Sequence, residues 1–221
     1  MNKIKHIIWD WNGTLVDDGW LFVEMINCVL KKRNMSQLSI LDYKKTFCFP
    51  LEKYYQKLGF DFNVEPYDIP SMEFVALYNK NKYRPNLYDG ATDLLRMIKN
   101  QGMKNYLLSA QNNDSLIDLV NFYNIGGFFE EISGTNNFHA RGKALLSSRL
   151  LENIGAKNNE ILFIGDTNLD VEIASLNKNL ILAATYGHQS KERFPKQENV
   201  CLVNNFNDLF SLLGLKFLDC P

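Results

Sequence analysis

From residue 89 onward, short apolar runs alternate with longer segments whose apolar residues recur every three or four positions. The short runs predict strands at 104–109, 131–133, 161–164, 180–184 and 200–203. The longer segments predict helices at 89–101, 113–123, 141–154, 168–176 and 206–213. A further run, Ile4 to Trp9, predicts a buried strand near the N-terminus. Such alternation predicts an α/β protein with a Rossmann-like parallel sheet covered by helices on both faces.

The alternation is interrupted after the first predicted strand. Apolar residues at helical spacing occupy positions 21–30, directly after Asp17 and Asp18, either of which can cap a helix. Segments 40–58 and 68–83 also predict helices, and Pro50 can open one. The segment 84–86, Arg-Pro-Asn, then ends the helical pattern. We therefore expect a core domain made of residues 1–15 and 85–221, with an inserted all-helical domain at 16–84.

Composition narrows the classes of function. The formal net charge of −1 gives no broad electrostatic reason to expect nucleic-acid or membrane binding. No apolar stretch approaches the roughly 20 residues of a membrane span, and the N-terminal run is short for a signal peptide. The four cysteines have no CxxC or zinc spacing, which favours reduced thiols and a cytoplasmic protein. The oligomeric state stays open between a monomer and a homodimer.

Polar residues follow several predicted strands, where open α/β sheets bind their ligands. In the segment Asp10-Trp11-Asn12-Gly13-Thr14, Asp10 directly follows a buried strand and is placed to act as a nucleophile or a metal ligand. Gly13 permits a tight turn whose backbone N–H groups can point at an anion. An Asn-Gly turn without any chemical role is the alternative interpretation.

A second acidic loop follows the strand predicted at 161–164. Asp166 and Asp170 are four residues apart, so one helical turn brings both carboxylates close together, as a hard cation requires. Either residue can instead simply cap the next helix. Ser109 can bond a phosphate oxygen, and Lys143 can supply positive charge to an anionic centre. Taken singly, a serine at a strand end and a lysine in a helix are also common structural residues.

These segments together resemble a known family. Asp10-x-Asn12-Gly13-Thr14, then Ser109, Lys143 and Gly165-Asp166-x-x-x-Asp170 resemble, in this order, the four motifs of the haloacid dehalogenase superfamily. The insert at 16–84 looks like the helical C1 cap of the phosphoglycolate phosphatase-like branch, and residues 84–90 resemble the return from cap to core. The resemblance covers nearly the whole chain. It implies a Mg²⁺-dependent phosphatase that hydrolyses a small phosphorylated metabolite.

The resemblance also implies catalytic and metal-binding roles. Asp10 would attack phosphorus and form an aspartyl-phosphate. Asp10, Asp166 and the backbone carbonyl of Asn12 would hold Mg²⁺, with Asp170 supporting the site directly or through water. Lys143 would neutralise Asp10 while it binds the transferring phosphoryl group. These roles suit phosphoryl transfer, in which positioning and charge neutralisation dominate catalysis.

The phosphate-binding roles come from the same resemblance. Ser109 and Lys143 would bind the phosphoryl oxygens, and Ala110 follows Ser109 in the same predicted phosphate site. Gly13 would offer its backbone N–H to the phosphate, and Thr14 would help shape the loop.

Asn12 departs from the family pattern, because most of these phosphatases have an aspartate there as general acid and base. An amide does not titrate in this range and cannot replace that acid, whose help is typically worth roughly 10²–10⁴-fold. Three explanations remain open. In the first, the substrate carries a good leaving group, as in a pyrophosphate or an acyl phosphate. In the second, another residue, such as His188, supplies the proton. In the third, turnover is slow or lost.

The alternatives to a phosphatase follow from this departure. One is a binding or regulatory protein that keeps the phosphate pocket with impaired catalysis. Another is a phosphonate or pyrophosphate hydrolase. Within the predicted cap, Phe49, Lys53 and Tyr54 are candidates for substrate contacts, although all three can simply pack the cap.

Overall fold

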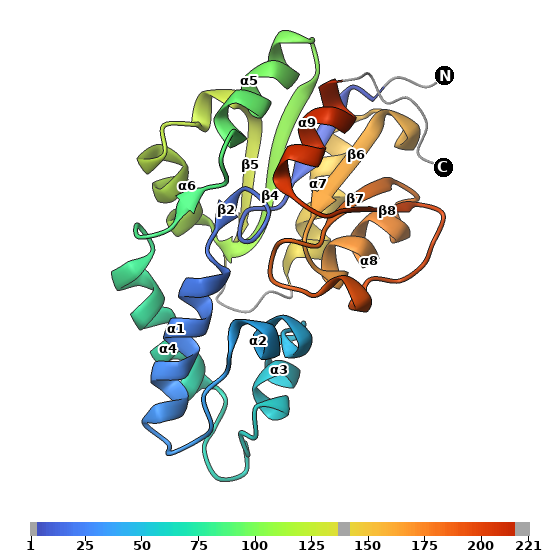
Figure 1. The fold of residues 1–221 in the computed structure, drawn as a ribbon. Helices are drawn as coiled ribbons and strands as arrows, with labels where there is room; N and C mark the ends of the chain where they lie inside the picture. Colours follow the sequence, from blue (N-terminus) through green and yellow to red (C-terminus); the bar gives the residue numbers. More distant parts are fainter. Residues whose placement is uncertain (1–3, 137–141, 215–221) are drawn as a thin grey trace.

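The computed structural model describes residues 4–136 and 142–214 (Figure 1). Its main sheet has six strands in the order β5-β4-β1-β6-β7-β8, and each neighbouring pair is parallel. The strands are β1 His6–Trp9, β4 Lys104–Asn112, β5 Phe129–Thr135, β6 Ile161–Gly165, β7 Leu180–Ala184 and β8 Val200–Val203. The predicted α/β parallel sheet is therefore confirmed.

Helices cover both faces of this sheet (Figure 1). The helices α5 Ala91–Asn100, α6 Asn113–Phe122 and α9 Phe206–Gly214 pack on one face, and α7 Lys143–Ile154 and α8 Asn168–Leu176 pack on the other. Within the described residues, 3₁₀ turns lie at Gly126–Phe128, Asn158–Glu160 and Lys191–Arg193. The central strand β1 sends Ile7 and Trp9 into the first layer and Ile8 into the second. Burial on both faces explains why β1 is an unbroken apolar run.

A helical part lies beyond one end of the sheet, at the lower end of Figure 1. It consists of α1 Gly19–Lys31, α2 Ile40–Thr46, α3 Leu51–Lys57 and α4 Asp68–Asn81. The predicted helix over 40–58 is in fact two helices, because the chain leaves α2 at Phe47 and Pro50 is the N-cap of α3. Aromatic side chains of these helices form a separate core cluster. We call α1–α4 the cap.

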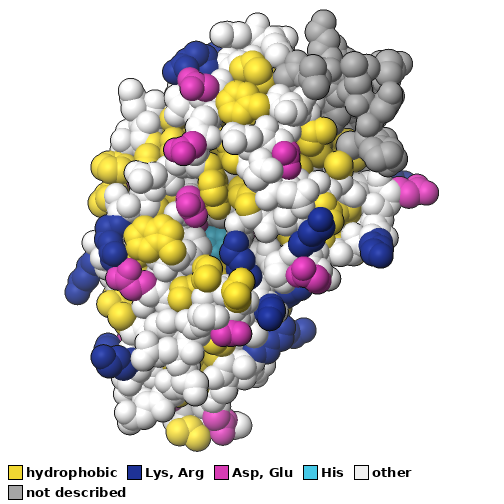
Figure 2. Space-filling model, viewed as in Figure 1, with side chains coloured by type: hydrophobic (Ala, Val, Ile, Leu, Met, Phe, Trp, Pro, Cys, Tyr) yellow, Lys and Arg dark blue, Asp and Glu magenta, His cyan; other side chains and the backbone are white. Residues whose placement is uncertain are grey.

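The chain leaves and re-enters the α/β part at one place. The strand β2 Val16–Asp17 pairs antiparallel with β3 Asn86–Leu87, so the two connections to the cap run side by side. Sequence periodicity did not predict these two-residue strands. Basic and acidic side chains are mixed over the face that Figure 2 shows. Among the described residues, no helix has both the length and the apolar character needed to cross a membrane.

Candidate active site

Three carboxylates meet at the carboxyl end of the sheet. Asp10 follows β1 and Asp166 follows β6, and these strands are parallel neighbours with Trp9 opposite Ile164. Asp170 lies in the first turn of α8, one helical turn after Asp166. Carboxylate oxygens of the three residues all lie within 4.8 Å of one another. The structure therefore brings together Asp10, Asp166 and Asp170, the three aspartates predicted from the sequence as metal ligands.

Lys143, the first residue of α7, links two of these carboxylates. Its Nζ donates to Asp10 Oδ1 at 2.6 Å and to Asp170 Oδ1 at 2.6 Å. Burial alone would lower the pKa of Lys143, but the charges of Asp10 and Asp170 outweigh it and raise that pKa above its ordinary value. Lys143 therefore carries a fixed positive charge beside Asp10.

The remaining charge in the cluster is negative. Burial raises the pKa of Asp10 more than Lys143 lowers it, and Asp170 and Asp166 add to the rise. Burial raises the pKa of Asp166 to about 6, although the His188 charge opposes the rise. Three carboxylates thus face one ammonium group, an imbalance that a bound cation would relieve.

The donor set fits a hard cation such as Mg²⁺. The cluster offers carboxylate oxygens with no histidine or cysteine ligand. Asp10 lines the pocket, and its Oδ2 has no hydrogen-bond partner among the described residues, so this oxygen is available to bind an ion. Asp170 Oδ2 is already occupied, because it accepts hydrogen bonds from Thr167 N at 3.0 Å and from Thr167 Oγ1 at 2.6 Å. Asp170 thus both caps α8 and supports the cluster.

Asp166 is held by a tight backbone cage. Its Oδ2 accepts from His188 N at 2.5 Å, and Thr14 Oγ1 donates to its Oδ1 at 3.3 Å. Gly13 has φ +71°, and a side chain there would overlap Asp166 and the ring of His188. A side chain on Gly187 would overlap Asp166 in the same way. Close approach of two loops to Asp166 therefore requires glycine at both positions.

The Asn12 side chain is fixed by a buried carboxylate that sequence reasoning treated only as a possible helix cap. Asn12 Nδ2 donates to Asp18 Oδ2 at 2.6 Å and to the hydroxyl of Tyr78 at 3.2 Å. Asp18 is the N-cap residue of α1, yet its side chain makes no capping bond and has no solvent exposure. Instead, Asp18 Oδ1 accepts from Gly13 N at 2.9 Å. That N–H also donates to Val16 O, so the structure does not direct it at a phosphate as expected.

His188 has both ring nitrogens engaged. Nε2 lies 3.1 Å from Asp18 Oδ1, and Nδ1 lies 2.6 Å from the hydroxyl of Tyr43 in the cap. Burial lowers the pKa of His188, but the hydrogen bond and charge of Asp18 outweigh it and raise that pKa. With both nitrogens committed, the ring joins the core loop to the cap and directs no proton toward a substrate. This geometry disfavours His188 as the missing proton donor.

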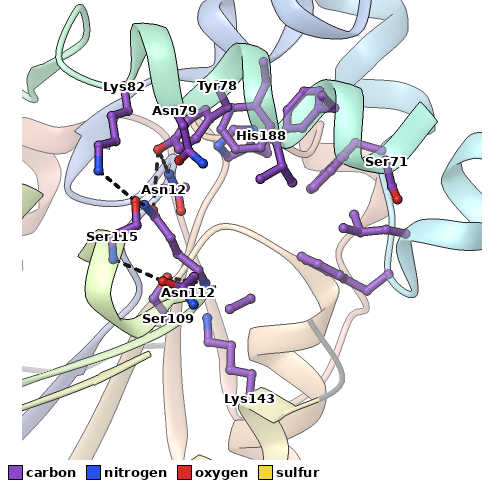
Figure 3. Close-up of a pocket in the computed structure, with 18 of the residues that line it drawn as sticks. Asn12, Ser71, Tyr78, Asn79, Lys82, Ser109, Asn112, Ser115, Lys143 and His188 are labelled. Atoms are coloured by element: carbon purple, nitrogen blue, oxygen red, sulfur yellow. Dashed lines mark hydrogen bonds between the residues drawn. The ribbon is translucent and has the colours of Figure 1, made fainter. Parts of the chain in front are cut away.

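A pocket of about 880 Å³ lies between the carboxylate cluster and the cap (Figure 3). The core end of its lining includes six of the predicted site residues: Asp10, Asn12, Ser109, Ala110, Lys143 and Asp166. Gly13, Thr14 and Asp170 lie behind them as supporting residues. Ser109 does not end its strand, because β4 continues to Asn112, and its Oγ accepts from Gln111 N at 3.1 Å. Three of the predicted phosphate-binding residues, Ser109, Ala110 and Lys143, thus line the pocket.

The cap supplies the other walls of the pocket. Figure 3 shows Ser71, Tyr78 and Asn79 of α4 opposite Ser109 and Lys143. Of the cap residues expected to contact substrate, Phe49 lines the pocket, Lys53 is exposed and Tyr54 is buried in the cap cluster. Sequence reasoning missed Tyr78 and Asp18, because neither lies in a recognisable motif and both act through contacts between distant segments.

The family follows from comparison with known proteins. Residues 7–183 match the haloacid dehalogenase-like hydrolases. The chain belongs to this family. The match includes both acidic loops, Ser109, Lys143 and all four cap helices.

Relatives with a known activity share only about a quarter of their aligned residues with this chain. Phosphoglycolate phosphatases of Salmonella typhi and Salmonella typhimurium are 25% identical over 166 residues. The alignment covers 69% of this chain and 64% of each relative. The chain therefore spans less than two thirds of the length of these relatives.

Solved structures share the fold over nearly the whole chain. A haloacid dehalogenase-like hydrolase from Streptococcus pneumoniae has a TM-score of 0.77 at 19% identity, covering 97% of this chain and 99% of its own. The Mycobacterium tuberculosis Protein Tyrosine Kinase A has a TM-score of 0.79 at 18% identity, covering 97% of this chain and 100% of its own. At these identities the likeness shows a shared fold and assigns no activity to this chain.

Proposed function

We propose that this chain is a Mg²⁺-dependent phosphatase that hydrolyses a small phosphorylated molecule through an aspartyl-phosphate on Asp10. The observation that carries the proposal is the position of Asp10. It lies at the floor of the pocket, bonded to Lys143 through one oxygen while the other oxygen has no partner among the described residues. A carboxylate with one neutralised oxygen and one free oxygen is ready to attack phosphorus.

The neighbouring residues take the supporting roles. Asp10, Asp166 and the Asn12 carbonyl would hold Mg²⁺, with Asp170 behind them, and the ion would neutralise phosphoryl oxygens. Ser109, Ala110 and the Lys143 ammonium would bind the phosphoryl group at the same end of the pocket. Gly13 and Thr14 shape the loop around Asp166 instead of contacting the phosphate directly.

The helical part would act as a cap. We propose that residues 16–84 form a cap domain on a core of 1–15 and 85–221, because both connections run through the paired strands β2 and β3. Contacts between α2 and the core loop hold the two parts together. Lys44 Nζ donates to Tyr186 O at 2.7 Å, and Gln189 Nε2 donates to Phe47 O at 2.9 Å. Opening at these contacts would admit substrate, and closing would exclude water.

Two alternatives rest on other observations. A phosphate-binding protein with lost turnover is suggested by Asn12, whose amide is locked by Asp18 and Tyr78. Phosphonate cleavage would need a free lysine amine in the pocket. The lysines that line the pocket within the described residues are Lys82 and Lys143, and both are ion-paired to aspartates. The pocket therefore favours a phosphatase over a phosphonate hydrolase.

The test is a turnover screen with phosphate esters, anhydrides and phosphonates, in Mg²⁺ and in excess EDTA. We expect hydrolysis in Mg²⁺ that Asp10→Asn abolishes. Asp17→Asn is the matched control, because Asp17 is an exposed aspartate in the same segment. Full turnover in EDTA, or an active Asp10→Asn variant, would contradict the proposal. Binding of phosphate without turnover would favour the regulatory alternative.

A further inference from the structure

The pocket is much larger than a phosphate site, and its cap side is mainly apolar. At about 880 Å³ it lies in the upper range of small-molecule sites. The cap walls are built from large side chains, among them Phe22, Phe47, Phe49, Phe74, Val75 and Tyr78. A two-carbon acid would leave most of this space without contacts. The walls instead match a bulky apolar group attached to the phosphate.

The aromatic wall begins where a leaving group would depart. Asp10 attacks from the core, so the departing oxygen faces the cap, on the side where the Asn12 amide meets the Tyr78 hydroxyl at 3.2 Å. From Tyr78 the rings continue without a gap. Ring centroids lie 5.4 Å apart for Phe22 and Tyr78 and 5.3 Å apart for Phe22 and Phe74. These rings pack against one another and all three line the pocket, so together they form an aromatic wall against which an aromatic leaving group would pack.

The charges around the pocket disfavour an anionic leaving group. Apart from Lys143 at the phosphate end, the basic side chains in the described lining are Lys82 and His188. Lys82 Nζ is held by Asp118 at 2.6 Å, and both ring nitrogens of His188 are engaged by Asp18 and Tyr43. Asp68 and Asp114 also line the pocket. A carboxylate such as that of glycolate would meet acidic residues and no free cation, which is unfavourable.

Asn12 selects the chemistry of the departing oxygen. The amide has no proton to give at neutral pH, and both nitrogens of His188 are committed to Asp18 and Tyr43. Burial raises the pKa of the nearby Tyr78 hydroxyl, which makes it a poor acid as well, so the leaving oxygen departs with its electron pair as an anion. A phenolate carries that charge on an oxygen conjugated with its ring, whereas an alkoxide cannot, so phenols are far better leaving groups without acid help.

We propose, on the basis of the phosphatase function above, that the substrate class is aryl phosphate monoesters, recognised by the aromatic cap wall. Asp10 forms a bond to phosphorus as the bond from phosphorus to the aryl oxygen breaks, and the phenolate takes a proton from solvent. Water then cleaves the aspartyl-phosphate; one of its protons leaves with inorganic phosphate and the other returns to solvent, replacing the proton that the phenolate took. The sum is aryl phosphate plus water giving phenol plus phosphate, with no oxidant or co-reactant.

A substrate series tests separately the need for a good leaving group and the recognition of an apolar group by the cap. With the whole protein in Mg²⁺, kcat/KM would be measured for phenyl, benzyl and hexyl phosphate, phosphoglycolate and acetyl phosphate. We expect phenyl phosphate to exceed benzyl phosphate by roughly 10²-fold or more, because only the benzyl ester needs the acid that Asn12 lacks. We expect benzyl and hexyl phosphate to exceed phosphoglycolate, because they fill the apolar walls.

Cap variants test the wall itself. Val75→Asn should lower kcat/KM for phenyl phosphate by about 10-fold through KM, and should therefore lower the ratio of phenyl phosphate to acetyl phosphate activity. Met72→Gln, at a lining residue that is 50% exposed and so tolerates the change, should act in the same direction. Ile69→Asn is the matched control, since Ile69 is exposed on the same helix and does not line the pocket.

The outcomes distinguish this proposal from the general function. Acetyl phosphate turnover with no preference for phenyl over benzyl phosphate, or with phosphoglycolate as the best ester, would overturn the aryl proposal and leave the phosphatase function standing. Val75→Asn and Met72→Gln variants that fold and keep full phenyl phosphate activity would also overturn it. Absence of turnover with every substrate, acetyl phosphate included, would remove the phosphatase function and this proposal with it.

Discussion

Replacing Asn12 by aspartate should place two carboxylates against each other in a buried loop. The Asn12 Nδ2 that donates to Asp18 Oδ2 at 2.6 Å becomes an oxygen, and Asp18 has no exposure to water. A hydrogen bond to a charged group is worth roughly 1.5–3 kcal/mol. Near neutral pH, the free energy of unfolding of Asn12→Asp should therefore fall by at least about 1.5–3 kcal/mol, measured by urea denaturation.

The loss should depend on pH. Burial and the neighbouring Asp18 charge keep the pKa of the introduced carboxyl in the folded protein above its unfolded value of about 4. Below that value the carboxyl is protonated in both states and can donate to Asp18, so the variant should approach the wild type. As pH rises, the unfolded state loses its proton first, and the deficit grows by about 1.4 kcal/mol per pH unit until the folded-state pKa is reached.

The double exchange Asn12→Asp with Asp18→Asn should restore the contact with its polarity reversed. An asparagine at position 18 can keep Oδ1 as the acceptor for Gly13 N and His188 Nε2, while its Nδ2 donates to the new carboxylate. The charge of the loop is unchanged. We expect the double variant to recover at least half of the lost stability and to lose most of the pH dependence. A double variant no more stable than Asn12→Asp would refute the reasoning.

Activity provides the second readout of the same exchange. The double variant has a carboxyl at the position from which an acid can protonate the leaving group. Hydrolysis of alkyl phosphates should rise by about 10-fold or more, with a smaller gain for phenyl phosphate. A folded double variant with no gain on any alkyl ester would show that position 12 does not face the leaving oxygen.

Three further predictions concern the carboxylate cluster. Mg²⁺ should raise the thermal unfolding midpoint more at pH 7.5 than at pH 5.5, because Asp166 has a pKa of about 6 and must be ionised to bind the ion. Equal shifts at the two pH values would argue against a Mg²⁺ site at Asp166. Lys143→Ala should lower kcat/KM by about 10²-fold or more, whereas Lys45→Ala at an exposed position should not; wild-type kinetics would mean another cation acts. Gly187→Ala should weaken Mg²⁺ binding measured by calorimetry, because its Cβ would overlap Asp166, while Gly127→Ala, with open space around it, should not.

Sequence periodicity located most of the core elements. The helix at 168–176 and the strands at 180–184 and 200–203 have the predicted bounds, because each is a clear apolar pattern between polar residues. The strand predicted at 104–109 continues to Asn112, where irregular pairing with β5 carries polar residues that no period-two pattern marks. The short pair β2 and β3 was missed because two-residue strands carry no periodicity.

The sequence likewise predicted some residues of the site and missed others. Asp10, Asp166 and Asp170 were predictable, since parallel strands bring their carboxyl ends to one edge and a helical turn separates the last two. Asp18 looked like an ordinary helix cap, and only the fold shows its carboxylate turned toward Asn12. Tyr78 reaches Asn12 from a helix more than sixty residues away in sequence. Contacts made across the cap boundary leave no local signal.

The central claim is that Asp10 becomes phosphorylated, and mass spectrometry of an acid-quenched reaction tests it most directly. The protein would be mixed with Mg²⁺ and acetyl or phenyl phosphate, quenched within the first turnover, digested and sequenced. The account predicts a phosphate adduct on the peptide containing Asp10, absent from Asp10→Asn and retained in Asp17→Asn. Steady turnover with no adduct on Asp10 at any quench time, or an adduct on another residue, would contradict it.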